Sequence, residues 1–130
     1  MALMKFREPN QVKWLGWRPA HRGTQILQQG IATNATTIVY TVPPGQTFYL
    51  TAFHFSCSTA IVGNGRAEIF NGVAVQQVLG FLRVITAAGW VPVCQNSYRF
   101  PLELPAGWVI RAISAIAAFT VTLGIHGWVE

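Results

Sequence analysis

The chain has 130 residues, of which nine are Lys or Arg and only four are Asp or Glu, all of them Glu. Globular domains carry about 25% charged and about 45–50% apolar residues, whereas this chain has 10% charged and 52% apolar residues. Its folded surface must therefore show large uncharged areas, which usually mark permanent contacts with other subunits. This composition argues against a monomeric solvated domain and favours an assembly protein.

Targeting and redox features are few. The longest nearly uncharged apolar stretch, residues 112–125, is shorter than the roughly 20 residues of a membrane-spanning helix, so no transmembrane helix is expected. The N-terminus lacks a basic cap followed by an apolar core, so no secretory signal is expected. Cys57 and Cys94 are too few for a disulfide framework and too far apart for a CxxC site. We expect them to be buried reduced thiols.

Residues 1–35 are predicted to form an extended arm. The formal charge is +4 over residues 1–23 and +1 over the rest, which gives the total of +5. No apolar alternation occurs here, and Pro and Gly are frequent, yet the segment is too apolar for a solvated tail. We therefore expect the arm to become ordered along a partner, through Lys5, Phe6, Arg7, Lys13, Trp14, Trp17, Arg18 and Arg22.

From residue 36 onward, β-branched and aromatic runs bounded by turn residues predict strands. Residues 47–58 are apolar on both faces, which predicts cover from two sides. Asn71-Gly72 predicts a type I′ hairpin turn, and residues 87–89 with Pro92 predict a loop. The expected strands are residues 36–42, 47–58, 66–70, 73–79, 81–86, 98–104, 108–114 and 119–129.

About eight short strands in about 95 residues predict one all-β domain over residues 36–130, a jelly-roll-like antiparallel β-sandwich. Val42-Pro43-Pro44-Gly45 returns as Leu104-Pro105-Ala106-Gly107, which indicates a repeated turn rather than a duplicated domain.

Residues that could carry chemistry are sparse. His21, His54 and His126 lack the close spacing of cupin metal ligands, so no metal or other cofactor is expected. A carboxylate pair from Glu68 and Glu103 and a Cys–His nucleophile stay open as alternatives, but no catalytic motif supports either. Gly63-Asn64-Gly65 lacks the Lys and the helix of a phosphate loop. We predict a protein that is not an enzyme.

The arm leaves two alternatives open. Its interleaved cations and indoles suit nucleic acid, because cations contact phosphates and indoles stack on bases. Trp and Arg are equally typical of protein interface anchors, and the body adds no basic stripe, so protein contact is favoured. Phe53, Phe55, Trp90, Trp108 and Trp128 are candidate oligomer-interface residues, with a core role as the default for the tryptophans. Sugar binding by exposed tryptophans is a third interpretation.

Four features of the sequence form a recognisable combination. They are the apolar-basic arm, the segment Tyr40-Thr41-Val42-Pro43-Pro44-Gly45-Gln46-Thr47-Phe48-Tyr49-Leu50-Thr51, the segment Pro101-Leu102-Glu103-Leu104-Pro105-Ala106-Gly107-Trp108 and the ending His126-Gly127-Trp128. It resembles the small β-sandwich decoration, or cement, proteins of tailed-bacteriophage heads. The resemblance lies in the general pattern of strand and turn residues over about residues 36–130.

This resemblance implies a homotrimer on the outer surface of a virion. It further implies that the trimer bridges neighbouring major capsid proteins, and that its arms clamp the shell or the next trimer. The alternatives are a tail, neck or host-binding protein and, through the arm, a nucleic-acid-binding protein. No membrane partner is expected.

Overall fold

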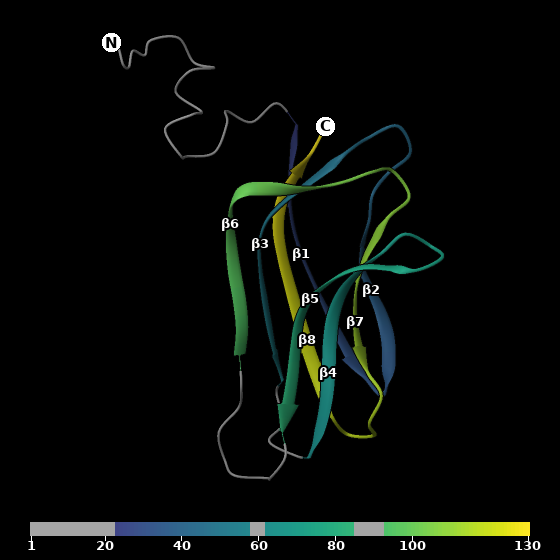
Figure 1. Ribbon diagram of the computed structural model, residues 1–130, viewed down its shortest axis with the longest axis vertical. Coiled ribbons are helices and arrows are strands. Elements are labelled where there is room, and N and C mark those ends of the chain that lie inside the picture. Colours follow the sequence, from purple (N-terminus) through teal and green to yellow (C-terminus); the bar gives the residue numbers. More distant parts are fainter. Residues whose placement is uncertain (1–22, 58–61, 85–92) are drawn as a thin grey trace, which may run out of the picture.

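Strands account for most of the residues that the computed structural model describes, which are 23–57, 62–84 and 93–130. The β-branched and aromatic runs of the sequence favour this structure. Figure 1 shows the strands and their labels. They are β1 (Thr24–Thr33), β2 (Ala35–Thr41), β3 (Phe48–Cys57), β4 (Gly63–Phe70), β5 (Val75–Val84), β6 (Val93–Leu104), β7 (Val109–Ser114) and β8 (Thr120–Val129).

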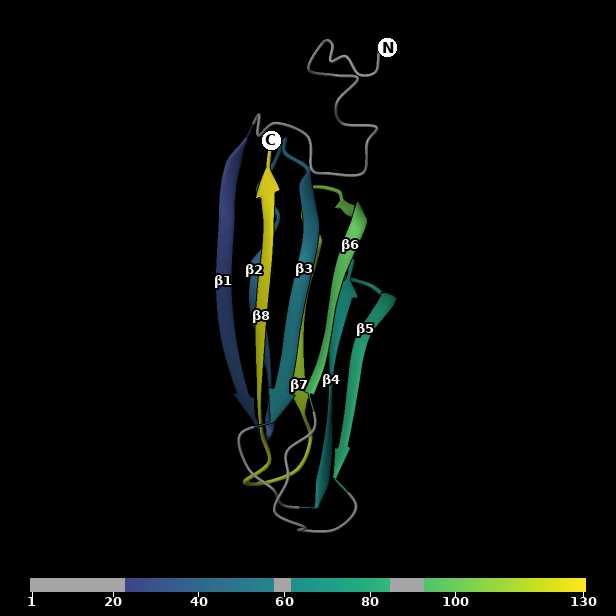
Figure 2. The same cartoon turned by 90° about the vertical axis from the view of Figure 1, so that its left-hand side faces the viewer.

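The strands form two four-stranded sheets in the orders β1-β8-β3-β6 and β2-β7-β4-β5. Figure 2 shows the strands of the first sheet side by side. Four of the six antiparallel pairings among the described strands join β1 with β8, β2 with β7, β3 with β6 and β4 with β5; the other two join β3 with β8 and β4 with β7. The first four are the pairings of one long hairpin folded over on itself. The predicted all-β antiparallel sandwich is confirmed.

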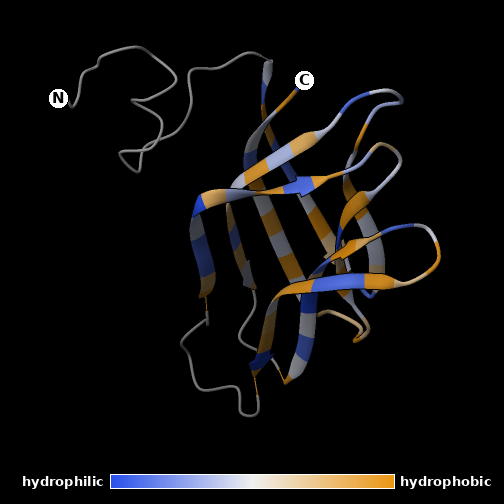
Figure 3. Cartoon of the chain, turned by 45° about the horizontal axis from the view of Figure 1, so that its top comes forward, coloured by the Kyte–Doolittle hydropathy of each residue, from blue (hydrophilic) through white to orange (hydrophobic). Residues whose placement is uncertain are grey.

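The core lies between the two sheets. Along the strands, apolar and polar residues alternate in bands (Figure 3), as expected where one face of each sheet is buried. Burying one such large side chain stabilises the fold by about 1.5–3 kcal/mol. The largest fully buried apolar side chains are Phe48, Phe55, Phe119, Leu50, Leu104, Ile110, Leu123 and Ile125.

A β-bulge explains why β3 is apolar on both faces. The register of β3 shifts between Leu50 and Ala52 against both β6 and β8, so Thr51 is the extra residue. A one-residue shift exchanges the two faces of a strand. Phe53 therefore faces the same core as Leu50, and His54 is exposed. The predicted cover on both sides of this strand is wrong, because the bulge turns both apolar sets inward.

The hairpin predicted at Asn71-Gly72 joins β4 and β5, but its turn is of another type. A type I′ turn needs positive φ at both central residues. Gly72 has a φ of 97°, whereas Asn71 is not among the described residues with positive φ. Instead, the Asn71 side-chain oxygen accepts hydrogen bonds from the backbone N–H groups of Val73 and Ala74, at 2.8 Å each. These side-chain hydrogen bonds close the turn without the two positive φ values that a type I′ turn requires.

The two Pro-x-Gly turns share the same glycine conformation and the same backbone hydrogen bond. Gly45 and Gly107 have φ values of 75° and 85°, in the region that favours glycine. In each turn the residue after glycine donates to the carbonyl of the first proline, at 3.2 Å. The turns also lie side by side, because the Gly107 N–H donates to the Val42 carbonyl at 2.9 Å. This repetition is consistent with a repeated turn, as predicted.

β1 corrects the predicted extent of the arm. Residues 24–33 pair with β8 over ten consecutive positions, so they belong to the sandwich. The core side of β1 carries Ile26, Gly30 and Ala32, with Gln28 between them, while Leu27 and Ile31 face outward. A side chain at Gly30 would lie 2.8 Å from the Val39 side chain, which explains the glycine. Residues 1–22 lie outside the described residues.

The boundaries of two further strands also differ from the prediction. Residues 73–79 and 81–86 were expected as separate strands, but β5 runs through Gly80. Gly80 lies where β5 approaches β6, since a Cβ there would be 3.0 Å from Cys94 Sγ. β6 begins at Val93, five residues earlier than expected. The loop predicted at residues 87–89 with Pro92 lies outside the described residues.

Candidate assembly surface

The described charges are confined to one part of the sandwich. No Asp, Glu, Lys or Arg occurs from residue 23 to residue 65, and β8 has none either. Strands β1, β2, β3 and β8 are thus without formal charge. The charged residues of the described ranges are Arg66, Glu68, Arg83, Arg99, Glu103, Arg111 and Glu130.

The outer face of β1, β8 and β3, together with residues 93–97 of β6, is here called the uncharged face and is built from rows of opposed residues. One row runs Leu27, His126, Ala52 and Ser97, and the next runs Gln29, Gly124, His54 and Gln95. Because the central positions Ala52 and Gly124 are small, an open depression of about 660 Å³ forms between the flanking side chains. It is lined by Leu27, Ala52, Phe53, His54, Gln95, Asn96, Ser97, Gly124, Ile125 and His126.

His126 is held in place by polar neighbours. The Thr51 hydroxyl donates to the His126 carbonyl at 2.8 Å, and Thr51 Oγ1 lies 3.1 Å from His126 Nδ1. His126 Nε2 lies 3.2 Å from Gln25 Oε1. The bulge residue Thr51 therefore orients the ring, which gives His126 a structural role.

At one end of the uncharged face, Tyr49 stacks on Trp128 with ring centroids 5.0 Å apart. Burial raises the pKa of the Tyr49 phenol, and the Glu130 and Glu103 carboxylates raise it further. These two carboxylates therefore face Tyr49. Burial also raises the pKa of Tyr40 and Tyr98.

We expect the folded protein to resist tyrosine ionisation. A phenol whose folded-state pKa exceeds its unfolded value of about 10 contributes stability in full below that pH. The contribution is lost as pH rises through the folded-state pKa. Phenolate absorbance of the native chain should therefore appear at higher pH than in denaturant, and Tyr49→Phe should reduce the alkaline loss of stability. Coincident native and denatured titrations would contradict the burial of the three phenols.

The outer face of the β2-β7-β4-β5 sheet carries an ion triad. Glu68 lies opposite Arg111 in the β4–β7 register. Its fully buried side chain is 2.7 Å from Arg66 Nε and 2.6 Å from Arg111 Nη2. The Arg111 guanidinium also lies 3.7 Å from the centre of the Phe70 ring. The triad is surrounded by exposed Ile38, Val75, Val78 and Phe81, so this face combines Arg with apolar groups as protein interfaces do.

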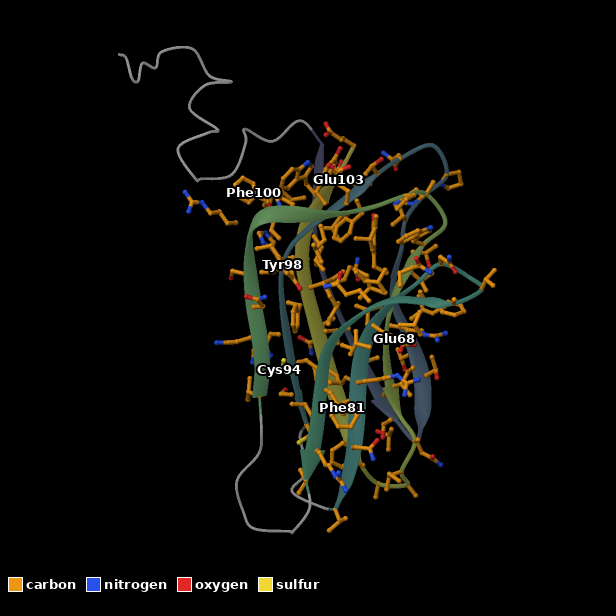
Figure 4. The ribbon with its side chains drawn as sticks, viewed as in Figure 1. Glu68, Phe81, Cys94, Tyr98, Phe100 and Glu103 are labelled. Atoms are coloured by element: carbon orange, nitrogen blue, oxygen red, sulfur yellow. The ribbon has the colours of Figure 1, made fainter. Side chains whose placement is uncertain are left out.

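The geometry separates the candidate chemical residues. Glu68 and Glu103 belong to different sheets and lie apart (Figure 4), so the possible carboxylate pair is wrong. Cys57 and Cys94 are free; Cys57 is buried and Cys94 half-buried. Burial raises the pKa of the Cys57 thiol, which disfavours a nucleophilic thiolate. Among the described residues, no three His, Cys or Glu side chains could together hold a metal ion.

The candidate interface residues have different outcomes. Phe53 and Phe55 are core residues with exposed fractions of 4% and 0%, so neither provides an oligomer surface. Trp128 is buried, and Trp108 is half-buried against the core. Trp90 and the arm residues Lys5, Phe6, Arg7, Lys13, Trp14, Trp17, Arg18 and Arg22 lie outside the described residues.

The structure instead exposes residues that were not singled out, among them Leu27, Ile38, Phe81 and Phe100. The strand register places Leu27, Ile38 and Phe81 on the outer faces, so a correct assignment of β1 would have identified Leu27. Within the described ranges, no helix is long and apolar enough to cross a membrane.

Comparison with known proteins finds matches among solved structures. No protein-family model matches the chain, and no curated protein does. Similar solved structures include a pentameric capsid protein isolated from metagenomic phage sequences, at 18% identity and a TM-score of 0.46. The similarity covers 80% of this chain and 59% of that protein.

Proposed function

We propose that this chain is a non-enzymatic structural protein of a virion. In this proposal it is a capsid decoration, or cement, protein that forms a homotrimer on the outer surface of a tailed-phage head and bridges major capsid proteins. The observation that carries the proposal is the confinement of charge, which leaves β1, β2, β3 and β8 without formal charge.

An uncharged surface of this extent suits repeated subunit contacts. Interface centres are depleted of charged residues, whereas solvated surfaces contain them. The uncharged face offers Gln, Ser, Thr and His side chains, which can form hydrogen bonds across a contact without the desolvation of formal charges. The apolar patch around Arg111 on the opposite face supplies a second contact surface of the type in which Arg and aromatic residues dominate binding.

The connectivity is compatible with the proposed virion role. The pairing of first with last strand, second with seventh, third with sixth and fourth with fifth suits a jelly roll of eight strands in two sheets. Jelly rolls occur in viral capsid and lectin domains. Because one fold serves many functions, the uncharged surface rather than the connectivity favours the structural role.

In this proposal the basic segment before β1 binds the shell. The segment leaves the sandwich beside Val129, because Gly23 packs closely against the Val129 backbone. Its 22 residues can span at most roughly 75 Å when extended, which is enough to reach a neighbouring subunit. Linked contacts of this kind raise the effective concentration of each partner across a lattice.

We expect a chain that begins at Gly23 to keep its oligomeric state and lose most capsid binding. A truncation at residue 36 would remove β1 from the sheet and is therefore unsuitable. Co-sedimentation with heads assembled without this protein measures the binding, and circular dichroism checks the fold. A folded truncated chain that binds heads as well as the intact chain would show that the arm is not a clamp.

A host-binding, lectin-like role is the second candidate, because the depression on the uncharged face is lined by amide, hydroxyl and imidazole groups. Its lining contains no Trp or Tyr, and the described Trp108 and Trp128 are not exposed. A glycan array with the intact chain tests this role. The nucleic-acid alternative predicts steep salt dependence of binding through the arm.

A further inference from the structure

The outer face of the β2-β7-β4-β5 sheet, here called the arginine face, places two arginines among apolar side chains. Two rows of opposed residues cross the sheet there. One row runs Ile38, Arg111, Glu68 and Val78, and the next runs Thr36, Ile113, Arg66 and Phe81. Each arginine thus has an exposed apolar neighbour on an adjacent strand, which is Ile38 beside Arg111 and Phe81 beside Arg66.

The exposed charge of the arginine face is positive. Arg66, Arg83 and Arg111 against Glu68 give this face a formal charge of +2. The Glu68 side chain is fully buried, whereas those of Arg66 and Arg111 are 45% and 20% exposed. The segments that join β3 to β4 and β5 to β6 contain no charged residue. Within the described ranges, the arginine face therefore presents cations to solvent and no exposed carboxylate.

Glu68 fixes both guanidinium groups and leaves donors for another acceptor. Its carboxylate contacts Arg66 through Nε at 2.7 Å, and Arg111 through Nε and Nη2 at 2.6 Å each. A guanidinium has several N–H donors, so these contacts use only part of them. The Arg111 guanidinium also lies 3.7 Å from the centre of the Phe70 ring. Because groups that are already held lose less freedom on binding, the two arginines are preorganised for a second carboxylate.

We propose that the arginine face binds a segment of the major capsid protein that presents an Asp or Glu side chain between apolar residues. The carboxylate lies against Arg66 and Arg111, and its apolar neighbours cover Ile38 and Phe81. This inference rests on the proposed function, because it takes the capsid shell as the partner. It assigns the shell to the arginine face and leaves the uncharged face for contacts between copies.

A different protein suits this face better than a second copy of the chain. Besides Glu68, the chain has only Glu8, which lies in the basic arm, and Glu103 and Glu130. Glu103 and Glu130 face Tyr49 of the other sheet. Two copies also repel each other, because each carries a net charge of +5. The carboxylate that the arginine face lacks therefore comes from a partner of opposite charge.

The apolar groups around the arginines favour protein over nucleic acid. Ile38, Val78 and Phe81 are each more than half exposed. A phosphate backbone offers no apolar groups to cover them, whereas arginine among apolar and aromatic side chains is typical of protein interfaces.

Binding of the full chain to heads assembled without this protein tests the inference. Arg66→Gln removes one exposed charge, and Phe81→Gln removes the opposed apolar side chain without changing the triad. Arg99→Gln and Phe100→Gln are the matched controls, because both residues are exposed on β6 of the other sheet (Figure 4). By co-sedimentation we expect each of the first two variants to bind about tenfold more weakly than the parent, and the controls to bind as the parent does.

The outcomes separate this inference from the proposed function. Circular dichroism checks the fold of each variant. If the parent binds heads and all four folded variants bind as tightly, the arginine face is not the contact, and the proposed function stands. If the parent itself does not bind heads, the proposed function is wrong and the inference falls with it.

Amidation of the head carboxylates with a carbodiimide and ethanolamine identifies the group that Arg66 contacts. On amidated heads the parent and Arg66→Gln should bind equally, because the carboxylate that distinguishes them has been removed. A parent that keeps its advantage on amidated heads would show that Arg66 does not contact a carboxylate. Binding of a DNA duplex that Arg66→Gln weakens and Arg99→Gln does not would assign the face to nucleic acid and overturn the inference.

Discussion

Gly127→Ala is expected to lower the free energy of unfolding by about 3 kcal/mol, the upper end of the usual effect of an added methyl group in a packed site. A Cβ at this position of β8 would overlap the Tyr49 carbonyl oxygen and lie 2.7 Å from Phe48 Cζ. The oxygen belongs to the β3 backbone, so it cannot move aside without disturbing the β3–β8 ladder. The strain therefore falls on the centre of the β1-β8-β3-β6 sheet.

Gly124→Ala is the matched control on the same strand. A Cβ there would have its nearest contacts at 4.0 Å, so the methyl group enters the open depression without a clash. We expect its stability to stay within about 0.5 kcal/mol of the parent. Thermal unfolding measures both variants, with an expected decrease of about 10 °C for Gly127→Ala. Equal melting temperatures for the two variants would contradict the register of β3 and β8.

Arg111→Ala is expected to have the second largest effect, about 3 kcal/mol of lost stability. The Glu68 side chain is fully buried, and Arg111, whose side chain is 20% exposed, holds one carboxylate oxygen. Removing Arg111 leaves that oxygen with no ionic partner and uncovers the Phe70 ring. The remaining contact with Arg66 keeps the effect at the lower end of the range for a broken buried ion pair.

Arg66→Ala supplies the comparison, because Arg66 holds the other oxygen of Glu68 but is 45% exposed. Exposed ion pairs contribute about 0–1 kcal/mol, so we expect a small loss. Urea unfolding curves for both variants measure the difference. If the order of the two effects is reversed, Arg111 is not the principal partner of Glu68.

The sandwich could be predicted because its strongest strands obey simple patterns. β7 and most of β8 alternate regularly between core and outer positions, and Pro and Gly before β3 and β7 favour turns that end the preceding strands. The number of strands was also correct, although one expected strand pair proved to be the single strand β5 and β1 was missed.

β1 could not be predicted because its pattern contradicts its position. Gln28 and Gly30 lie on the core side, while Leu27 and Ile31 lie outside. Gly30 is needed where β1 approaches Val39, a requirement that arises only from the contact between the two sheets. The strand is specified by its long pairing with β8 rather than by local alternation.

The low charge of the surface could be predicted from the sequence, but the residues that form the surface could not. Low charge indicated assembly, yet Phe53 and Phe55 were assigned to an interface because a one-residue bulge at Thr51 is not visible in the sequence. The Arg66, Glu68 and Arg111 triad likewise depends on the β4–β7 register, which joins residues 43 positions apart.

The central claim is that this sparsely charged chain is an assembly subunit, and its solution mass tests that claim most directly. Light scattering of the purified full-length protein should give a molar mass several times the 14.3 kDa of one chain. The oligomers should also co-sediment with phage heads in a fixed ratio. A monodisperse monomer that does not bind heads would contradict both the assembly surface and the proposed capsid role.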